Sequence, residues 1–117
     1  MKRDYLLYVE DILDSINKIE IFVEGMNFQQ FVQDDKTASA VIRKLEIIGE
    51  ASKNIPDSIK QQYSQIPWKE MARMRDKITH HYFDIDYEVV WKILKEELSQ
   101  VKPFVVEIMK QGESQNR

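Results

Sequence analysis

Apolar residues recur at spacings of three and four along most of the chain, which is the pattern of amphipathic helices rather than of strands. Four long segments follow it: residues 4 to 24, residues 38 to about 54, a segment that starts at Pro67, and one that starts at Asp84 or Asp86. Short helices fit between them, over residues 28 to 32 and 57 to 63. The pattern predicts an all-α protein, an antiparallel bundle of four to five helices.

Residues with capping side chains or unusual backbone freedom predict where the first two long helices begin and end. Asp4 suits the N-cap of the first helix, and Asp35 or Thr37 suits that of the second. Gly25 suits the C-terminal cap of the first helix, because glycine adopts the left-handed conformation without a steric penalty.

Three prolines predict further helix ends. Pro56 should end the second helix at or just before Ile55, and Pro67 suits the first position of the third helix, where its missing N–H would be unpaired anyway. Pro103 should kink or break the last helix. We expect a single domain over residues 1 to 110 and a polar tail over residues 111 to 117, which has no reason to be ordered.

The composition fits one small domain and excludes several classes of protein. A chain of 117 residues with 43% hydrophobic residues can bury a core without metal or disulfide staples. The absence of cysteine excludes disulfides, thiolate zinc sites and a cysteine nucleophile. No stretch reads as a signal peptide or a transmembrane helix, so we expect a cytoplasmic protein without a membrane partner.

Charge is unevenly distributed along the chain. The net charge is -3, yet residues 43 to 77 carry eight basic and five acidic side chains, whereas both flanking segments are net acidic. Scatter over a charged helical surface explains this as well as a binding site does. The basic middle segment overlaps the start of the most reactive stretch, residues 73 to 84, which holds both histidines.

The stretch from 73 to 84 has a structural and a catalytic interpretation. A histidine near a helix C-terminus is often only a favourable partner of the helix dipole. Metal chemistry is not favoured, because neither the His pair at i and i+4 nor the Glu-x-x-His pattern of helical metal sites occurs, and we expect no metal and no cofactor. Arginine and histidine without metal suit phosphodiester chemistry on RNA, in which the 2′-hydroxyl is the nucleophile.

The angular positions on the third helix raise a question about this chemistry. Trp68, Met71, Arg75, Ile78 and Tyr82 are predicted to follow one face of that helix. His80 would be displaced by about 140° from Arg75 on an ideal helix, so one straight helix cannot easily direct both side chains to one phosphate. Either the helix ends before His80, or two copies of the chain in a symmetric dimer assemble the site.

The chain resembles the HepT-like ribonuclease toxins of the HEPN superfamily, the helical partners of minimal nucleotidyltransferase (MNT) antitoxins. Residues 75 to 82 read R-x4-H-x-Y, the mark of that family, and the flanking segments 40 to 56, Pro67 with Trp68, and 84 to 91 are similar in order and spacing. The resemblance implies a HEPN-like helical bundle, a homodimer with a composite cleft, and a metal-independent endoribonuclease that acts on RNA, with no DNA substrate expected.

The resemblance also implies roles for individual residues. Arg75 would bind and stabilise the scissile phosphate, His80 would transfer protons, and Asp76 would help orient the pair. Tyr82 would be the tyrosine to which some antitoxins transfer AMP, a modification that would block the cleft by added charge and bulk. His81 would satisfy an R-x5-H reading, but only His80 gives the His-x-Tyr extension, so His81 is expected beside the site.

Other interpretations stay open at this point. Glu50 is a further cleft candidate, although pairing with Lys53 or Arg43 explains it as well. The main alternative function is a non-catalytic, substrate-binding companion subunit of a nucleotidyltransferase, which would use the same bundle. A purely structural helical dimer would explain the apolar stripes but would leave the R-x4-H-x-Y motif a coincidence.

Overall fold

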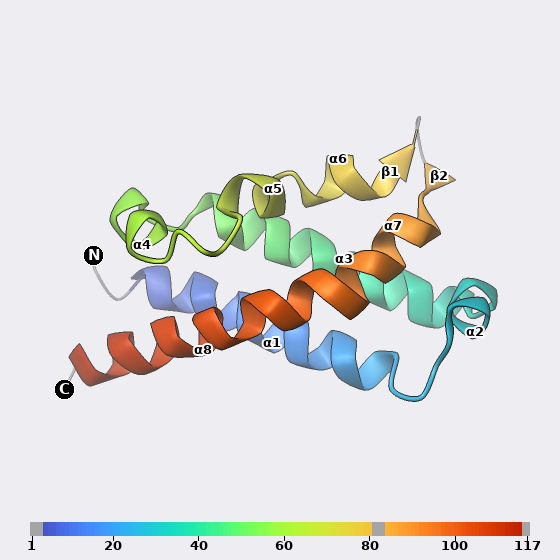
Figure 1. The fold of residues 1–117 in the computed structure, drawn as a ribbon, viewed down its shortest axis with the longest axis horizontal. Helices are drawn as coiled ribbons and strands as arrows, with labels where there is room; N and C mark the ends of the chain where they lie inside the picture. The colour runs from blue at the N-terminus through green and yellow to red at the C-terminus, as the bar shows by residue number, and fades with distance from the viewer. Residues whose placement is uncertain (1–3, 81–83, 116–117) are drawn as a thin grey trace.

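Three long helices form the body of the molecule. The computed structural model describes residues 4 to 80 and 84 to 115. Helix α1 (Asp4–Phe22) packs against both α3 (Asp35–Lys53) and α8 (Leu98–Gln115), and both of these run antiparallel to it, so the start of α1 and the end of α8 lie at the same end of the bundle (Figure 1). The all-α helical bundle expected from the sequence is confirmed.

The core lies where the apolar faces of these three helices meet. The stripe of α1 expected from its periodicity is buried through Val9, Ile12, Ile16 and Ile19, and Val41, Leu45 and Ile48 face it from α3. Ser52 is the one buried polar side chain of α3, and its hydroxyl donates a hydrogen bond to the carbonyl oxygen of Ile48 at 2.7 Å. Buried polar groups are tolerated when they are satisfied in this way.

Between α1 and α3 the chain turns through Gly25 and the short helix α2 (Phe28–Gln33). Gly25 has φ of +77°, the left-handed conformation for which it was expected. The N-cap of α3 is Asp34, one residue before Asp35 and three before Thr37, the two predicted candidates. Its carboxylate accepts hydrogen bonds from both the backbone N–H and the hydroxyl of Thr37. Asp35 is instead the first residue of the helix.

The third predicted helix is divided into two short ones. After α4 (Asp57–Gln62), the chain forms α5 (Trp68–Ala72) and α6 (Met74–Ile78), which are separated at Arg73. Trp68 holds the start of α5 in place, since its indole N–H donates a hydrogen bond to the carbonyl oxygen of Tyr63 at 3.1 Å. The buried face runs through Met74 and not through Arg75, which is exposed, so the predicted common face was wrong at that residue.

After α6 the chain leaves the helical conformation. Thr79–His80 (β1) pairs antiparallel with Asp84–Ile85 (β2), a two-residue ladder that the sequence pattern did not predict. Helix α7 (Tyr87–Lys92) then begins after Asp86, whose side chain accepts a hydrogen bond from Val89 N–H. It continues through a π-helical turn, η1 (Ile93–Glu97), into α8.

The last helix differs from the prediction at two points. Helix α8 runs through Pro103 without a break, because Val101, Val105 and Ile108 on its inner face are buried and hold it to the bundle. It also extends to Gln115, beyond the predicted start of a tail, and Gly112 there packs directly against Leu6 of α1. Within the residues described, we find no helix with the length and apolar character needed to cross a membrane.

Candidate functional site

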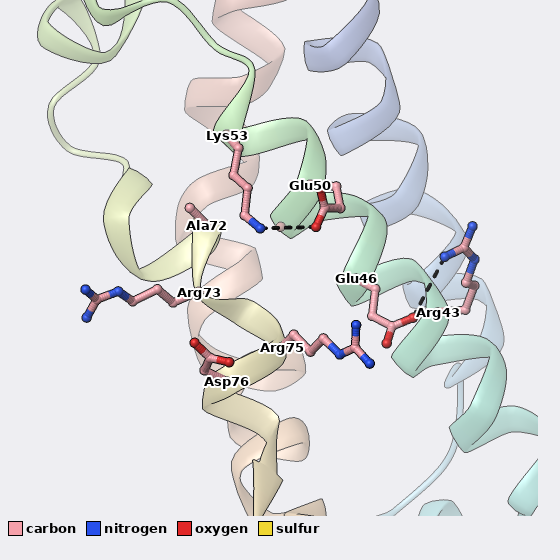
Figure 2. A pocket seen from close by; sticks show the side chains of 9 residues that line it. Arg43, Glu46, Glu50, Lys53, Ala72, Arg73, Arg75 and Asp76 are labelled. Carbon is pink, nitrogen blue, oxygen red and sulfur yellow. Dashed lines mark hydrogen bonds and ion pairs between the residues drawn. The ribbon is translucent and has the colours of Figure 1, made fainter. Parts of the chain in front are cut away.

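A groove of about 240 Å³ lies between α3 and the α5–α6 pair. Its lining includes Arg75 and Asp76 of the sequence motif. The α3 wall contributes Arg43, Glu46, Gly49, Glu50 and Lys53, and the opposite wall adds Ala72 and Arg73 (Figure 2). The structure therefore brings the start of the motif to a surface hollow, across from a polar face of α3.

Gly49 explains why the two walls approach so closely. A Cβ atom at this position would lie 3.1 Å from the backbone oxygen of Met71 and 3.2 Å from Cβ of Met74. Glycine inside a helix is unfavourable relative to alanine, so its presence in the middle of α3 needs a packing reason. That reason is the contact with α5 and α6, which forms the base of the groove.

Arg75 is exposed on α6, and its side chain reaches across the groove toward Glu46 on α3 (Figure 2). Among the residues that the structure describes, no ion pair or side-chain hydrogen bond engages its guanidinium group. A guanidinium presents donors in a planar fork that matches two phosphate oxygens. Arg75 is therefore available to an anionic ligand in the groove.

The remaining charges of the groove form weak surface pairs. Lys53 lies 3.1 Å from Glu50, and Arg43 lies 3.8 Å from Glu46, with most of these side chains exposed to solvent. The interpretation of Glu50 as a partner of Lys53 is confirmed, and Glu50 lines the groove as well. Exposed pairs of this kind contribute little to stability, so their cations can exchange carboxylate for phosphate at small cost.

Helix α6 ends before the first motif histidine. The hydroxyl of Thr79 donates to the carbonyl oxygen of Arg75 at 2.8 Å, and Asp86 N–H donates to that of Ile78 at 2.8 Å. These bonds satisfy carbonyl groups that the last helical turn leaves free. The helix therefore ends at Ile78, before His80, as the first of the two alternatives for the angular mismatch requires; the dimer alternative is not tested by this observation.

The second half of the motif is described only in part. His80 is a backbone member of β1, while the predicted supporting residues His81 and Tyr82 lie outside the described residues. Asp76 lines the groove next to Arg75. In the described part of the chain, no three His, Cys, Asp or Glu side chains gather closely enough to share a metal ion.

Sequence reasoning missed most of the α3 wall, although a signal was present. Arg43, Glu46, Glu50 and Lys53 are spaced by three, four and three residues, so they occupy one face of a helix. Gly49 interrupts the same helix beside that face. A charged stripe with a helical glycine next to it indicates close packing of a second element along one edge.

The chain is similar to a known family over most of its length. The family model described as "Ribonuclease HepT-like" matches residues 12 to 108. "Probable ribonuclease HepT" of Thermococcus cleftensis is 53% identical over 102 residues, which cover 87% of this chain and 93% of the relative. "Putative RNase MJ0127" of Methanocaldococcus jannaschii is 44% identical over 117 residues, 98% of this chain and 97% of the relative.

A third relative, "Putative RNase TTE0752" of Caldanaerobacter subterraneus, is 40% identical over 102 residues, 87% of this chain and 91% of the relative. No solved structure matches the chain. The family match covers well over half of the sequence and includes both walls of the groove and the R-x4-H-x-Y motif. The chain belongs to the HepT-like ribonuclease family.

Proposed function

We propose that this chain is a metal-independent endoribonuclease, the toxin of a HEPN/MNT toxin–antitoxin system, with its site at the groove between α3 and α6. The observation that supports this most is the placement of Arg75: an exposed guanidinium without a partner among the described residues, directed into a groove, on a helix that ends two residues before His80. The names of the relatives, all described as ribonucleases, support the same substrate class.

The proposed reaction is an internal transesterification. The 2′-oxygen of the RNA attacks the adjacent phosphorus as its proton is removed, the bond to the 5′-oxygen breaks, and that oxygen leaves with a proton. The products are a 2′,3′-cyclic phosphate and a 5′-hydroxyl end. His80 serves in proton transfer, because an imidazole can both accept and donate a proton near neutral pH.

Arg75 stabilises the charge that accumulates on the phosphate oxygens in the transition state. Asp76, its neighbour in the groove, helps orient the Arg75 and His80 pair. His81, next to His80 in the sequence, is proposed as a supporting residue. Two copies of the chain form a symmetric homodimer with a composite cleft, which concentrates the basic segments of both copies around the RNA.

The proposed partner is a cognate minimal nucleotidyltransferase antitoxin. It transfers AMP to Tyr82, two residues after His80, and the added phosphate and adenosine exclude RNA from the cleft by charge and bulk. Incubation of the chain with ATP and this partner should therefore add one AMP mass at Tyr82 and abolish cleavage.

The test uses the purified chain with total RNA and transfer RNA in EDTA, beside Arg75→Ala and His80→Ala variants whose circular dichroism matches the parent. Cleavage by the parent and by neither variant is the expected result. Cleavage that requires an added divalent metal would contradict the metal-independent mechanism.

Inactivity of all three proteins needs one further measurement, the mass of the Tyr82 peptide. A parent that carries AMP is the blocked form and should regain activity when a phosphodiesterase removes the group. An unmodified parent that binds RNA without cleaving it would overturn the proposal in favour of the non-catalytic companion subunit.

A further inference from the structure

Lys77 is a charged residue of α6, the helix that carries Arg75, but it does not line the groove. It follows Arg75 by two residues on α6, so the two side chains leave the helix about 200° apart. Its Nζ lies 2.6 Å from Oε1 of Glu97 and 3.8 Å from Oε2 of Glu70. The side chain is only 29% exposed. Arg75 lines the groove, whereas Lys77 faces Glu97 of the η1 turn (Ile93–Glu97) on the other side of α6.

Glu97, its partner, occupies an unusual place. It is the last residue of the π-helical turn η1, in which Leu98 N–H bonds to the carbonyl oxygen of Ile93, five residues back. Such turns are rare and are often found at functional positions. The Glu97 side chain is 34% exposed and shares a narrow hollow with Lys77 and with apolar side chains, namely Met71, Met74, Ile93, Leu98 and Val101.

Helix α6 cannot hold its own orientation. It has five residues and no side-chain cap at its start, too short to be stable without tertiary contacts. Met74 and Ile78 are buried, which fixes how deeply α6 sits against the bundle. Apolar contacts are not directional, so they restrain its rotation weakly. A short charge-assisted hydrogen bond has a preferred geometry and can fix that rotation.

We infer that the Lys77–Glu97 ion pair is a positioning contact for the proposed ribonuclease site: it locks the rotation of α6 on the η1 turn and so directs Arg75 into the groove. The inference rests on the proposed function for its catalytic consequence. Neither residue touches RNA. Lys77 is thus a cation within the R-x4-H motif whose role is to hold the helix rather than a phosphate.

Stability alone does not account for the pair. An ion pair among apolar side chains can often be replaced by apolar residues of similar size without loss of stability. Methionine at both positions would fill the hollow and keep the length of both side chains, but would remove the direction that the ion pair imposes. The double substitution therefore separates orientation from folding.

The test compares the parent with Lys77→Met/Glu97→Met and with Lys77→Arg. Misplacement of a catalytic group by about 1 Å can cost roughly a hundredfold in rate, so we expect kcat of the double variant to fall about ten- to a hundredfold while KM changes by less than about twofold. Lys77→Arg keeps the ion pair and should retain most of the parent kcat.

Lys102→Met/Glu20→Met provides a matched control. Lys102 on α8 and Glu20 on α1 form another interhelical ion pair, at 2.8 Å and of comparable exposure, away from the motif. Its loss should leave kcat within about twofold of the parent. Equal losses of kcat in the two double variants would overturn the inference, as would full kcat in Lys77→Met/Glu97→Met.

A second readout does not depend on catalysis. Residual dipolar couplings of the amides of residues 74 to 78 report the orientation of α6 relative to α3. We expect them to change in Lys77→Met/Glu97→Met and not in the control variant. If a parent without AMP on Tyr82 does not cleave RNA, the proposed function fails, while these couplings still decide the role of the ion pair: unchanged couplings would refute it.

Discussion

The bundle of α1, α3 and α8 and the segment from Pro67 to Asp86 are built on different principles. The three long helices have 18 or 19 residues each and bury continuous apolar stripes. The described residues of the segment form two helices of five residues and two strands of two. Its shape depends on individual contacts: the glycine of α3, the Thr79 hydroxyl and the Lys77–Glu97 pair. The periodic pattern of apolar residues determines the scaffold of α1, α3 and α8, whereas specific contacts between individual residues determine the shape of the site.

This difference predicts that scaffold and site respond to different substitutions. A change in a long helix should alter stability and leave the activity of the folded molecules unchanged. A change at the groove should do the reverse. A change at the contact between the two regions should alter both.

The largest effect is expected from Ile12→Ala in α1. Ile12 is fully buried, and truncation of a buried isoleucine to alanine costs about 2 to 5 kcal/mol, depending on how far the cavity collapses. Urea denaturation followed by circular dichroism measures the loss. Leu7→Ala, on the same helix at a side chain that is 62% exposed, should change stability by less than about 0.5 kcal/mol. Similar losses in both variants would contradict the assignment of the buried face.

The next effect concerns Arg75→Lys at the groove. Lysine keeps the charge but lacks the planar fork that binds two phosphate oxygens. Removal of one such donor costs about 10² to 10³ in rate, so we expect a partial loss of about ten- to a hundredfold in kcat/KM, or about 1.4 to 2.7 kcal/mol. Steady-state cleavage of a fluorogenic RNA measures it. Because Arg75 is exposed, the denaturation midpoint should not move, and a large shift would mean that this residue belongs to the scaffold.

Gly49→Ala tests the contact between the two regions. The methyl group gains about 1 kcal/mol of helix propensity, but it meets the Met71 backbone oxygen and Met74 Cβ within 3.2 Å, and overpacking of this kind costs about 1 to 3 kcal/mol. We expect a net loss of about 1 kcal/mol in the free energy of unfolding, together with a lower kcat because α6 is displaced. Ser39→Ala, at an exposed position of α3, is the control for propensity alone and should be neutral or slightly stabilising.

The smallest effect lies at the N-cap of α3 and depends on pH. Hydrogen bonds from the Thr37 backbone N–H and hydroxyl lower the pKa of Asp34 below its ordinary 3.8. A carboxyl whose pKa is lowered by folding stabilises the protein above its unfolded pKa, and that contribution is lost as the pH falls through the folded value. The melting temperature of the parent should therefore exceed that of Asp34→Asn slightly at pH 7, and the difference should shrink as the pH falls below 3.8 through the lower pKa of the folded protein. A constant difference over this range would disprove the charged cap.

Most of the scaffold could be predicted from the sequence, because the period of apolar residues and the capping residues at helix ends act on their own segment of the chain. Gly25 and the apolar stripe of α1 are examples, and even the error at the start of α3 is a shift of one residue, from Asp35 to Asp34. The prediction failed where tertiary contacts override local preference. Buried neighbours carry α8 through Pro103, and Met74 rather than Arg75 takes the buried position on α6.

The sequence indicated which motif residues to expect in the candidate site, but not which other parts of the chain surround them. The R-x4-H-x-Y motif pointed to Arg75, and the groove contains it. The α3 wall and the Lys77–Glu97 pair could not be found in the same way, because residues 20 or more positions apart meet only in the folded chain. Glu97 did carry a sign of its role, since it falls at helical spacing between the buried residues Leu94 and Val101, and a carboxylate in such a position needs a partner.

The chemical identity of the RNA ends produced in EDTA tests the central claim most directly. Attack by the 2′-oxygen at a site of Arg75 and His80 predicts a 2′,3′-cyclic phosphate on one fragment and a 5′-hydroxyl on the other, both detectable by mass spectrometry and both absent with Arg75→Ala. Fragments with 3′-hydroxyl and 5′-phosphate ends, or cleavage that persists in Arg75→Ala, would contradict the account.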